Sequence, residues 1–154
     1  MKKPKIFITT GSVLEFDELI KVLDDINKTK KYDIIAQIGV GKYIPKNIKY
    51  FKFADKLEKY FNWGDIVITH TGAGTLFELL ELNKKIICVS NPKAIDNHEI
   101  AEKFARKNSL IFLSESELFK LEKYINKLLT ENKIKKYHRP TCNIGIVILK
   151  FIKN

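Results

Sequence analysis

Short apolar runs rich in β-branched residues alternate along this chain with longer segments in which apolar residues recur at helical spacing. The short runs predict strands, since most of them stop at a glycine, a proline or a polar turn. We expect strands at residues 5–10, 33–38, 48–53, 65–70, 85–90 and 110–113. We expect helices at 12–26, from the 71–75 turn to 82, and at 56–63, 97–107 and 114–129. The first helix should begin with a capping box of Ser12 and Glu15.

Strands and helices that alternate in this way predict an α/β fold, a Rossmann-like parallel sheet with helices on both faces. Each crossover has to return the chain to the same edge of the sheet. The 154 residues suffice for one such domain, which we place at residues 1–130, followed by a C-terminal tail at 131–154. Ligands of open parallel sheets bind beyond the carboxyl ends of the strands. The site should therefore be built from the loops at these ends.

Charge adds a second constraint, because 28 Lys and Arg against 18 Asp and Glu give a net charge of +10. Such an excess fits nucleic-acid binding, attraction to an anionic membrane, or solubility alone. Arg occurs only at Arg106 and Arg139, and base readout favours Arg, so we expect no specific nucleic acid. Cys88 and Cys142 offer neither a disulfide framework nor metal-ligand spacing, which indicates a reduced, cytoplasmic setting and no metal.

The most distinctive motif is His70-Thr71-Gly72-Ala73-Gly74-Thr75-Leu76-Phe77-Glu78, between a predicted strand and a predicted helix. Glycines let a ligand approach the backbone, and the start of a helix favours an anion such as a diphosphate. The spacing is neither a Walker A loop nor GxGxxG, since Phe77 takes the third glycine position. A tight turn without any ligand is the alternative. Glu78 could accept hydrogen bonds from a ribose diol or could simply be solvated.

A polar segment at residues 91–99 precedes the next predicted helix. Its side chains suit the hydroxyl groups of a sugar, although an N-cap at Asp96 or Asn97 explains part of this pattern without a ligand.

The order of these motifs, from Gly11-Ser12 through residues 37–41 and 70–78 to 96–99, resembles the C-terminal, donor-binding domain of family 28 glycosyltransferases. These are GT-B enzymes, of which this domain forms the C-terminal half. The resemblance is to the free-standing form of the domain, the soluble subunit of the two-part N-acetylglucosaminyltransferase for dolichol-linked precursors and its bacterial counterparts. It covers about residues 5–113.

The resemblance implies roles for individual residues. The donor diphosphate would be bound by Gly11, Ser12, Gly72, Ala73, Gly74 and Thr75. The nucleotide and its ribose would contact Gly39, Gly41 and Glu78, and the sugar would contact Asn97, His98 and Glu99. Glu99 departs from the glutamine common in the family, and a carboxylate cannot donate a hydrogen bond as an amide does.

The resemblance also implies an activity, the inverting transfer of a sugar from a UDP-sugar to a lipid-linked acceptor without cofactor or metal. The donor would be UDP-N-acetylglucosamine or another UDP-hexose. A membrane-associated, acceptor-binding glycosyltransferase subunit would supply the general base and hold this chain at the cytoplasmic face of the membrane. His70 is the possible catalytic residue of this chain, although support of the diphosphate site is the role that we favour.

Two alternatives remain open at this point. The chain could be a complete homodimeric transferase with His70 or His98 as base, or a non-catalytic module that binds a nucleotide or nucleic acid. The apolar stretch at 143–152 could form a helix or a strand, and could dock on the partner or on the domain itself. It is too short to cross a bilayer, which takes ~20 residues.

Overall fold

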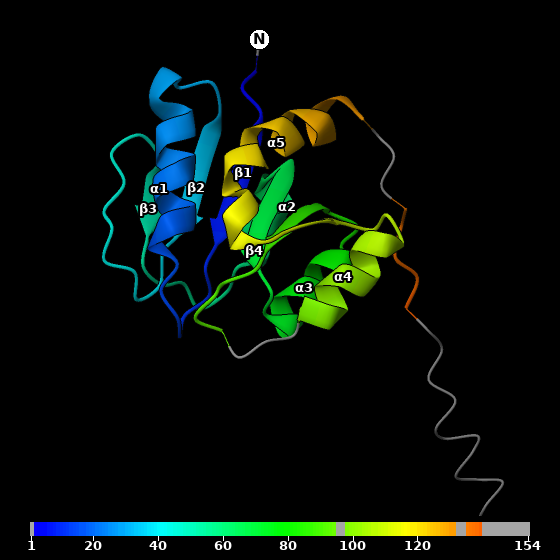
Figure 1. The fold of residues 1–154 in the computed structure, drawn as a ribbon. Coiled ribbons are helices and arrows are strands. Elements are labelled where there is room, and N and C mark those ends of the chain that lie inside the picture. The colour runs from blue at the N-terminus through cyan, green and yellow to red at the C-terminus, as the bar shows by residue number, and fades with distance from the viewer. Residues whose placement is uncertain (1, 95–97, 132–134, 140–154) are drawn as a thin grey trace, which may run out of the picture.

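The computed structural model describes residues 2–94, 98–131 and 135–139. These form a parallel sheet of six strands in the order β3-β2-β1-β4-β5-β6, with helices on both faces (Figure 1). The strands are β1 (Lys5–Thr9), β2 (Asp33–Gln37), β3 (Lys49–Phe51), β4 (Ile66–His70), β5 (Lys85–Val89) and β6 (Ile111–Leu113). The chain runs outward from β1 to β3, then returns to place β4 on the other side of β1. The predicted fold class is confirmed.

Within the described residues, five α-helices and two 3-10 segments cover the sheet. The α-helices are α1 (Asp17–Ile26), α2 (Glu58–Trp63), α3 (Ala73–Glu81), α4 (His98–Arg106) and α5 (Leu121–Thr130). The 3-10 segments are η1 (Asn27–Thr29) and η2 (Glu115–Lys120). No described helix is of a length and hydrophobicity that would span a bilayer.

The sheet separates two hydrophobic cores, because successive side chains of a strand point to opposite faces. Ile6 and Ile8 of β1 pack with α1 and α5 on one face. Phe7 between them packs on the other face with Phe61 of α2 and with α3 and α4. All four side chains are buried. Since both faces are covered, the loops at the strand ends are left to form the binding surface.

The predicted start of the first helix is wrong. Helix α1 begins at Asp17, Phe16 is its N-cap residue, and no side-chain hydrogen bond caps it, so Ser12 and Glu15 form no capping box. Gly11 has φ of +77°, which turns the chain into a loop after β1. The carboxylate of Glu15 instead pairs with Lys93, at 2.8 Å. The loop consequently keeps Gly11 and Ser12 at the carboxyl edge of the sheet.

The last predicted helix divides into η2 and α5, and η2 starts at a capping box in which Ser114 and Glu117 bond reciprocally. Beyond α5, residues 135–139 lie against α4, where the Lys135 N–H donates to the Asn108 carbonyl at 2.9 Å. The proposed tail segment at 143–152 lies outside the described residues, and the boundary at residue 130 stays a prediction.

Candidate functional site

The carboxyl ends of β1 and β4, the two central strands, carry two glycine loops with an imidazole between them. His70 is the last residue of β4 and is half-buried. A Cβ atom on Gly11 would lie 2.6 Å from Nε2 of His70, and one on Gly72 would lie 2.9 Å from Cε1 of its ring. Side chains at either glycine would therefore displace the imidazole. This packing supports a structural role for His70.

The turn after β4, at residues 71–72, leads directly into α3. Gly72 is the N-cap residue, with φ of −60° and ψ of 113°, and no side chain caps the helix. The first backbone N–H groups of a helix have no partner within it, so they are available to an anion at its positive end. A Cβ on Gly74 would meet no atom within 4 Å. The packing of the protein itself therefore does not require glycine here, and the space in front of the helix is open.

A groove of about 490 Å³ runs along this edge of the sheet between α2 and α3. It brings together four of the predicted site residues, Gly11, Ser12, Thr75 and Glu78. The other lining residues are Thr9, Gln37, Phe53, Ala54, Asp55, Lys56, Leu57, Glu58 and Phe61. Glu78 is exposed on α3, one helical turn beyond Thr75. The groove thus has the Gly11–Ser12 loop and the Thr75 hydroxyl near the start of α3, and the Glu78 carboxylate one turn farther along the helix.

Hydrogen bonds between β1 and β2 position the loop that begins at Gly11. Thr9 Oγ1 donates to Gln37 Oε1 at 2.7 Å and accepts from the Gly11 N–H at 3.2 Å. Thr9 and Gln37 are both buried. Buried hydrogen-bonded pairs of this kind fix local geometry, because breaking one leaves an unsatisfied polar group. They therefore fix where Gly11 stands in the groove.

Gly39 and Gly41 lie behind this loop and are buried. Gly39 has φ of +55°, and a Cβ there would collide with the Gly11 carbonyl oxygen. A Cβ on Gly41 would lie 2.7 Å from Oδ1 of Asp17 and 2.8 Å from the Ile38 carbonyl oxygen. Neither glycine lines the groove, so in this structure both serve the close packing of the loops. Their contact with a nucleotide stays a prediction.

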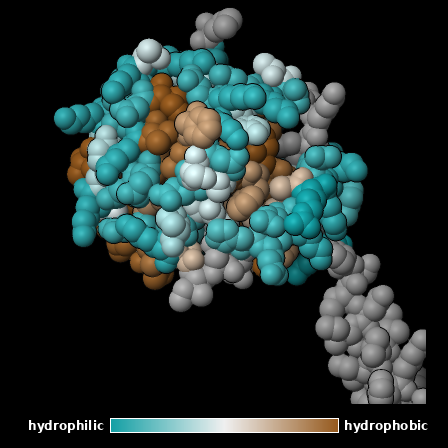
Figure 2. Space-filling model, in the orientation of Figure 1, coloured by the Kyte–Doolittle hydropathy of each residue, from teal (hydrophilic) through white to brown (hydrophobic). Residues whose placement is uncertain are grey.

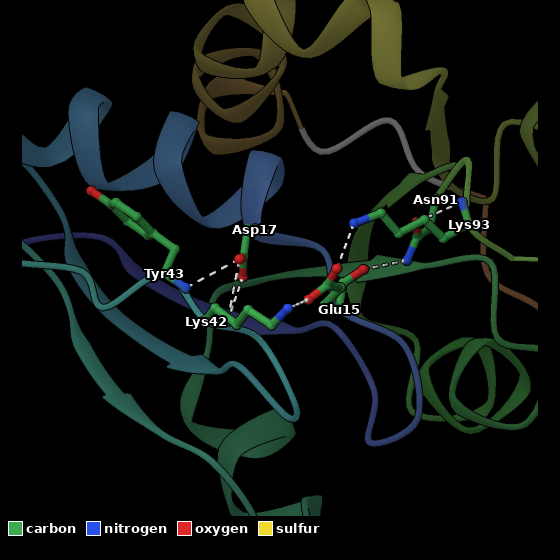
Figure 3. Close-up of polar contacts among 6 residues, drawn as sticks. All are labelled: Glu15, Asp17, Lys42, Tyr43, Asn91 and Lys93. Atoms are coloured by element: carbon green, nitrogen blue, oxygen red, sulfur yellow. Dashed lines mark hydrogen bonds and ion pairs between the residues drawn. The ribbon is translucent and has the colours of Figure 1, made fainter.

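Ionic and amide contacts tie the first loop to the loops after β2 and β5 (Figure 3). The Glu15 carboxylate lies 2.8 Å from Lys93 Nζ and 4.0 Å from Lys42 Nζ. The hydrogen bond from Lys93, its positive charge and that of Lys42 lower the pKa of Glu15. The buried Asn91 donates through Nδ2 to the Glu15 carbonyl at 3.1 Å and accepts from the Lys93 N–H at 3.0 Å. Three of the loops at this edge therefore form one connected unit.

The carboxylate of Asp17 joins this unit at the first turn of α1. It accepts the backbone N–H groups of Lys42, at 3.1 and 3.2 Å, and of Tyr43, at 3.1 Å (Figure 3). Acidic residues at the start of a helix also interact favourably with the positive end of its dipole. Asp17 therefore fixes the path of the loop after β2.

The predicted sugar-binding residues lie apart from the groove lining. His98 and Glu99 begin α4, Glu99 is exposed, and the ring of His98 packs edge to face on Phe112 with centroids 5.9 Å apart. Asn97 lies outside the described residues. Ala73 is the first residue of α3 and, like Gly72, is not among the groove's lining residues. The sugar contacts stay a prediction.

Segment 53–58 forms one wall of the groove and was not among the site residues expected from the sequence. Phe53 is 65% exposed although it is aromatic and follows a strand. The carboxyl-edge rule would have included it, because β3 is parallel to the others. The described residues contain no group of three or more His, Cys, Asp or Glu placed to hold a metal ion.

A sequence model of the glycosyltransferase family 28 C-terminal domain matches residues 5–145. The chain belongs to this family. It is 29% identical over 122 residues to the human UDP-N-acetylglucosamine transferase subunit ALG13, a match that covers 70% of this chain and 11% of that protein. The UDP-N-acetylglucosamine–N-acetylmuramyl-(pentapeptide) pyrophosphoryl-undecaprenol N-acetylglucosamine transferase of Shewanella pealeana is 24% identical over 159 residues, covering 92% of this chain and 42% of that one. The chain thus spans less than half the length of both relatives.

Solved structures agree with the fold. The crystal structure of MurG from Acinetobacter baumannii superposes with a TM-score of 0.72 at 23% identity, over 96% of this chain and 52% of that one. The glycosyltransferase family 28 domain described here therefore has the fold of one half of a GT-B glycosyltransferase, as expected.

Proposed function

We propose that this chain is the donor-binding subunit of a bipartite, inverting glycosyltransferase and that its groove binds a UDP-sugar. The observation that carries the proposal is the convergence of Gly11, Ser12, Thr75 and Glu78 on one groove beside the open start of α3. The human relative is named as a UDP-N-acetylglucosamine transferase subunit, which favours UDP-N-acetylglucosamine as donor.

The groove suggests how the donor lies in it. The diphosphate would sit at the start of α3, against Thr75 and the Gly11–Ser12 loop, where backbone N–H groups and the helix dipole favour an anion. The ribose diol would reach Glu78, and the base would lie along the wall at 53–58. The same groups would stabilise the UDP that departs during transfer, because its charge grows as the glycosidic bond breaks.

A second subunit completes the proposal. The chain has the fold of half of a GT-B enzyme, and its human relative is named as a subunit. The relative from Shewanella is named for an undecaprenol-linked acceptor, so we infer a lipid-linked acceptor held by a membrane-associated partner at the cytoplasmic face. The partner would supply the general base, since the imidazole of His70 is packed against Gly11 and Gly72.

Calorimetry on the full chain tests the donor. We expect UDP and UDP-N-acetylglucosamine to bind, and ADP to bind much more weakly. Glu78→Gln should weaken binding of UDP at least about tenfold, the loss expected for a hydrogen bond to a charged group. Glu81→Gln is the matched control, because Glu81 lies on the same helix outside the groove. It should bind UDP as the unsubstituted chain does.

Three results would contradict this function. Equal affinity for ADP and UDP would remove the assignment of the nucleotide. Turnover of a lipid-linked acceptor by the purified chain, at the rate of an assembled enzyme, would show a complete transferase. Tight, salt-sensitive RNA binding that Glu78→Gln and Gly74→Ala leave unchanged, without UDP binding, would favour the nucleic-acid module.

A further inference from the structure

A second groove, of about 620 Å³, includes Phe77 of α3 and shares no lining residue with the groove proposed to bind the donor, which we call the donor groove. It is formed by α4 and by the segment 135–139, which runs beside α4 after the end of α5 (Figure 1). The lining residues are Phe77, Ile100, Lys103, Phe104, Arg106, Lys107, Ser109, Lys135, Lys136, Tyr137 and His138. We refer to it as the α4 groove.

Positive charge surrounds the α4 groove. Lys103, Lys107, Lys135 and Lys136 are exposed, and none of the residues that line the groove is acidic. No described carboxylate lies within ion-pair distance of these four lysines, whereas Arg106 pairs with Glu102 at 3.2 Å. Figure 2 shows a largely hydrophilic surface over α4, at the lower right. Four solvated cations thus stand together without a counter-charge from the described part of the chain.

The floor of the α4 groove is aromatic. Phe104 packs edge to face on Phe77 at 5.8 Å and on Tyr137 at 5.5 Å between ring centroids. Phe77 is 38% exposed and Leu82, at the end of the same helix, is 36% exposed. The surface is therefore amphipathic, with apolar side chains between ammonium groups. Interfaces with phospholipid combine these two features, because lysine stems lie along apolar surface while their heads meet phosphate.

Single-stranded nucleic acid fits this surface less well. It stacks bases on exposed aromatic faces and uses Arg guanidinium groups. Here the rings are engaged with one another, and both arginines are paired, Arg106 with Glu102 and Arg139 with Glu81 at 3.4 Å. Lysines bind phosphate as point charges, so they can bind phosphate headgroups without arginine.

Beside the basic residues of the α4 groove, the sequence contains an apolar segment that also favours a bilayer. From Arg139 the chain continues within a few residues into its most apolar stretch, Ile144-Gly145-Ile146-Val147-Ile148-Leu149. Peptide segments bind an anionic bilayer more strongly when they combine apolar residues with basic charge, and this part of the sequence has both. Charge and hydropathy therefore point to the same occupant.

We propose that the α4 groove docks on the anionic headgroups of a phospholipid bilayer. This contact is made by the chain itself and does not depend on the donor or on a partner subunit. Phe77 lines the α4 groove and Glu78 lines the donor groove, so α3 separates the two. Docking through α4 would hold the donor groove beside the membrane surface with its opening unobstructed.

Vesicle flotation with the full chain tests the proposal. We expect binding to vesicles that contain about a third phosphatidylglycerol, little binding to pure phosphatidylcholine, and weaker binding as salt rises, because the Debye length shortens. A lysine near an anionic surface contributes about fivefold to partitioning. Replacing Lys103, Lys107, Lys135 and Lys136 by Gln should therefore weaken partitioning by about 600-fold, with unchanged circular dichroism and UDP binding.

The amino edge of the sheet offers a matched control. A groove of about 640 Å³ there is also rich in lysine, but it contains Asp33, which pairs with Lys49 at 3.2 Å. Replacing Lys3, Lys30, Lys46 and Lys49 by Gln removes the same number of charges, and we expect a change within about threefold. Equal losses for both variants would show binding by net charge and overturn the proposal. So would a chain that ignores anionic vesicles, or an α4-groove variant that loses RNA binding while its vesicle binding is intact.

Discussion

The imidazole of His70 fills the space that a side chain on Gly11 would need, with Nε2 2.6 Å from the missing Cβ. Gly11 also has φ of +77°, a conformation that strains other residues. Gly11→Ala should therefore lower the free energy of unfolding by about 1–3 kcal/mol and weaken UDP binding. Urea denaturation and calorimetry measure the two effects. An unchanged midpoint would show that the loop gives way at no cost.

Gly74→Ala should act in the opposite direction on stability. A Cβ there meets nothing within 4 Å, and alanine favours a helix over glycine by up to about 1 kcal/mol. We expect the same or a higher free energy of unfolding, together with a loss of UDP affinity of about tenfold or more, because in the proposed donor position the diphosphate would meet the methyl group. A variant that is stabilised and still binds UDP normally would place the diphosphate elsewhere.

Asn91 and Lys93 both join the first loop to the loop after β5, but their contributions to stability should differ. Asn91 is 1% exposed, and both the nitrogen and the oxygen of its side-chain amide form hydrogen bonds. Asn91→Ala should therefore cost about 1–3 kcal/mol in free energy of unfolding. The Lys93–Glu15 pair is solvated, so Lys93→Gln should cost much less than Asn91→Ala. Urea denaturation of both variants decides, and an equal loss would contradict this ranking.

Glu117 should make stability depend on acid pH. Hydrogen bonds from Lys120 and from the backbone and side chain of Ser114 lower the pKa of Glu117 from 4.5 to about 2. The folded state therefore binds this proton less readily than the unfolded chain, so the contribution of Glu117 is complete above about pH 4.5 and is lost as the pH falls toward 2. Glu117→Gln should show a shallower loss of stability between pH 5 and pH 3, as measured by urea denaturation.

Glu115→Gln serves as the control for this titration, since Glu115 lies on the same 3-10 segment. Its stability should fall as steeply with acid as that of the unsubstituted chain. If Glu117→Gln and the unsubstituted chain lose stability in parallel, the capping box does not hold the Glu117 carboxylate in its charged form.

The strands could be predicted from the sequence to within two residues because a short apolar run rich in β-branched residues is a local property. The start of α1 could not, because residues 12–16 form a loop in which Glu15 contacts Asn91 and Lys93, far along the chain, instead of capping the helix. Segment 53–58 was missed for a related reason. It reaches the site only through the strand order, in which β1 separates β2 and β3 from β4. Gly11, Thr75 and Glu78 line one groove because their motifs follow the central strands β1 and β4, while their contact with a donor stays a prediction.

The two outer strands, β3 and β6, have three residues each. Lys49 and Tyr50 of β3 are exposed, and a short edge that carries lysine offers little unpaired backbone to another chain. A second subunit would therefore not join by adding a strand to this sheet. It would have to recognise side chains and loops instead, so substitutions at the surface could change the choice of partner while the sheet stays as it is.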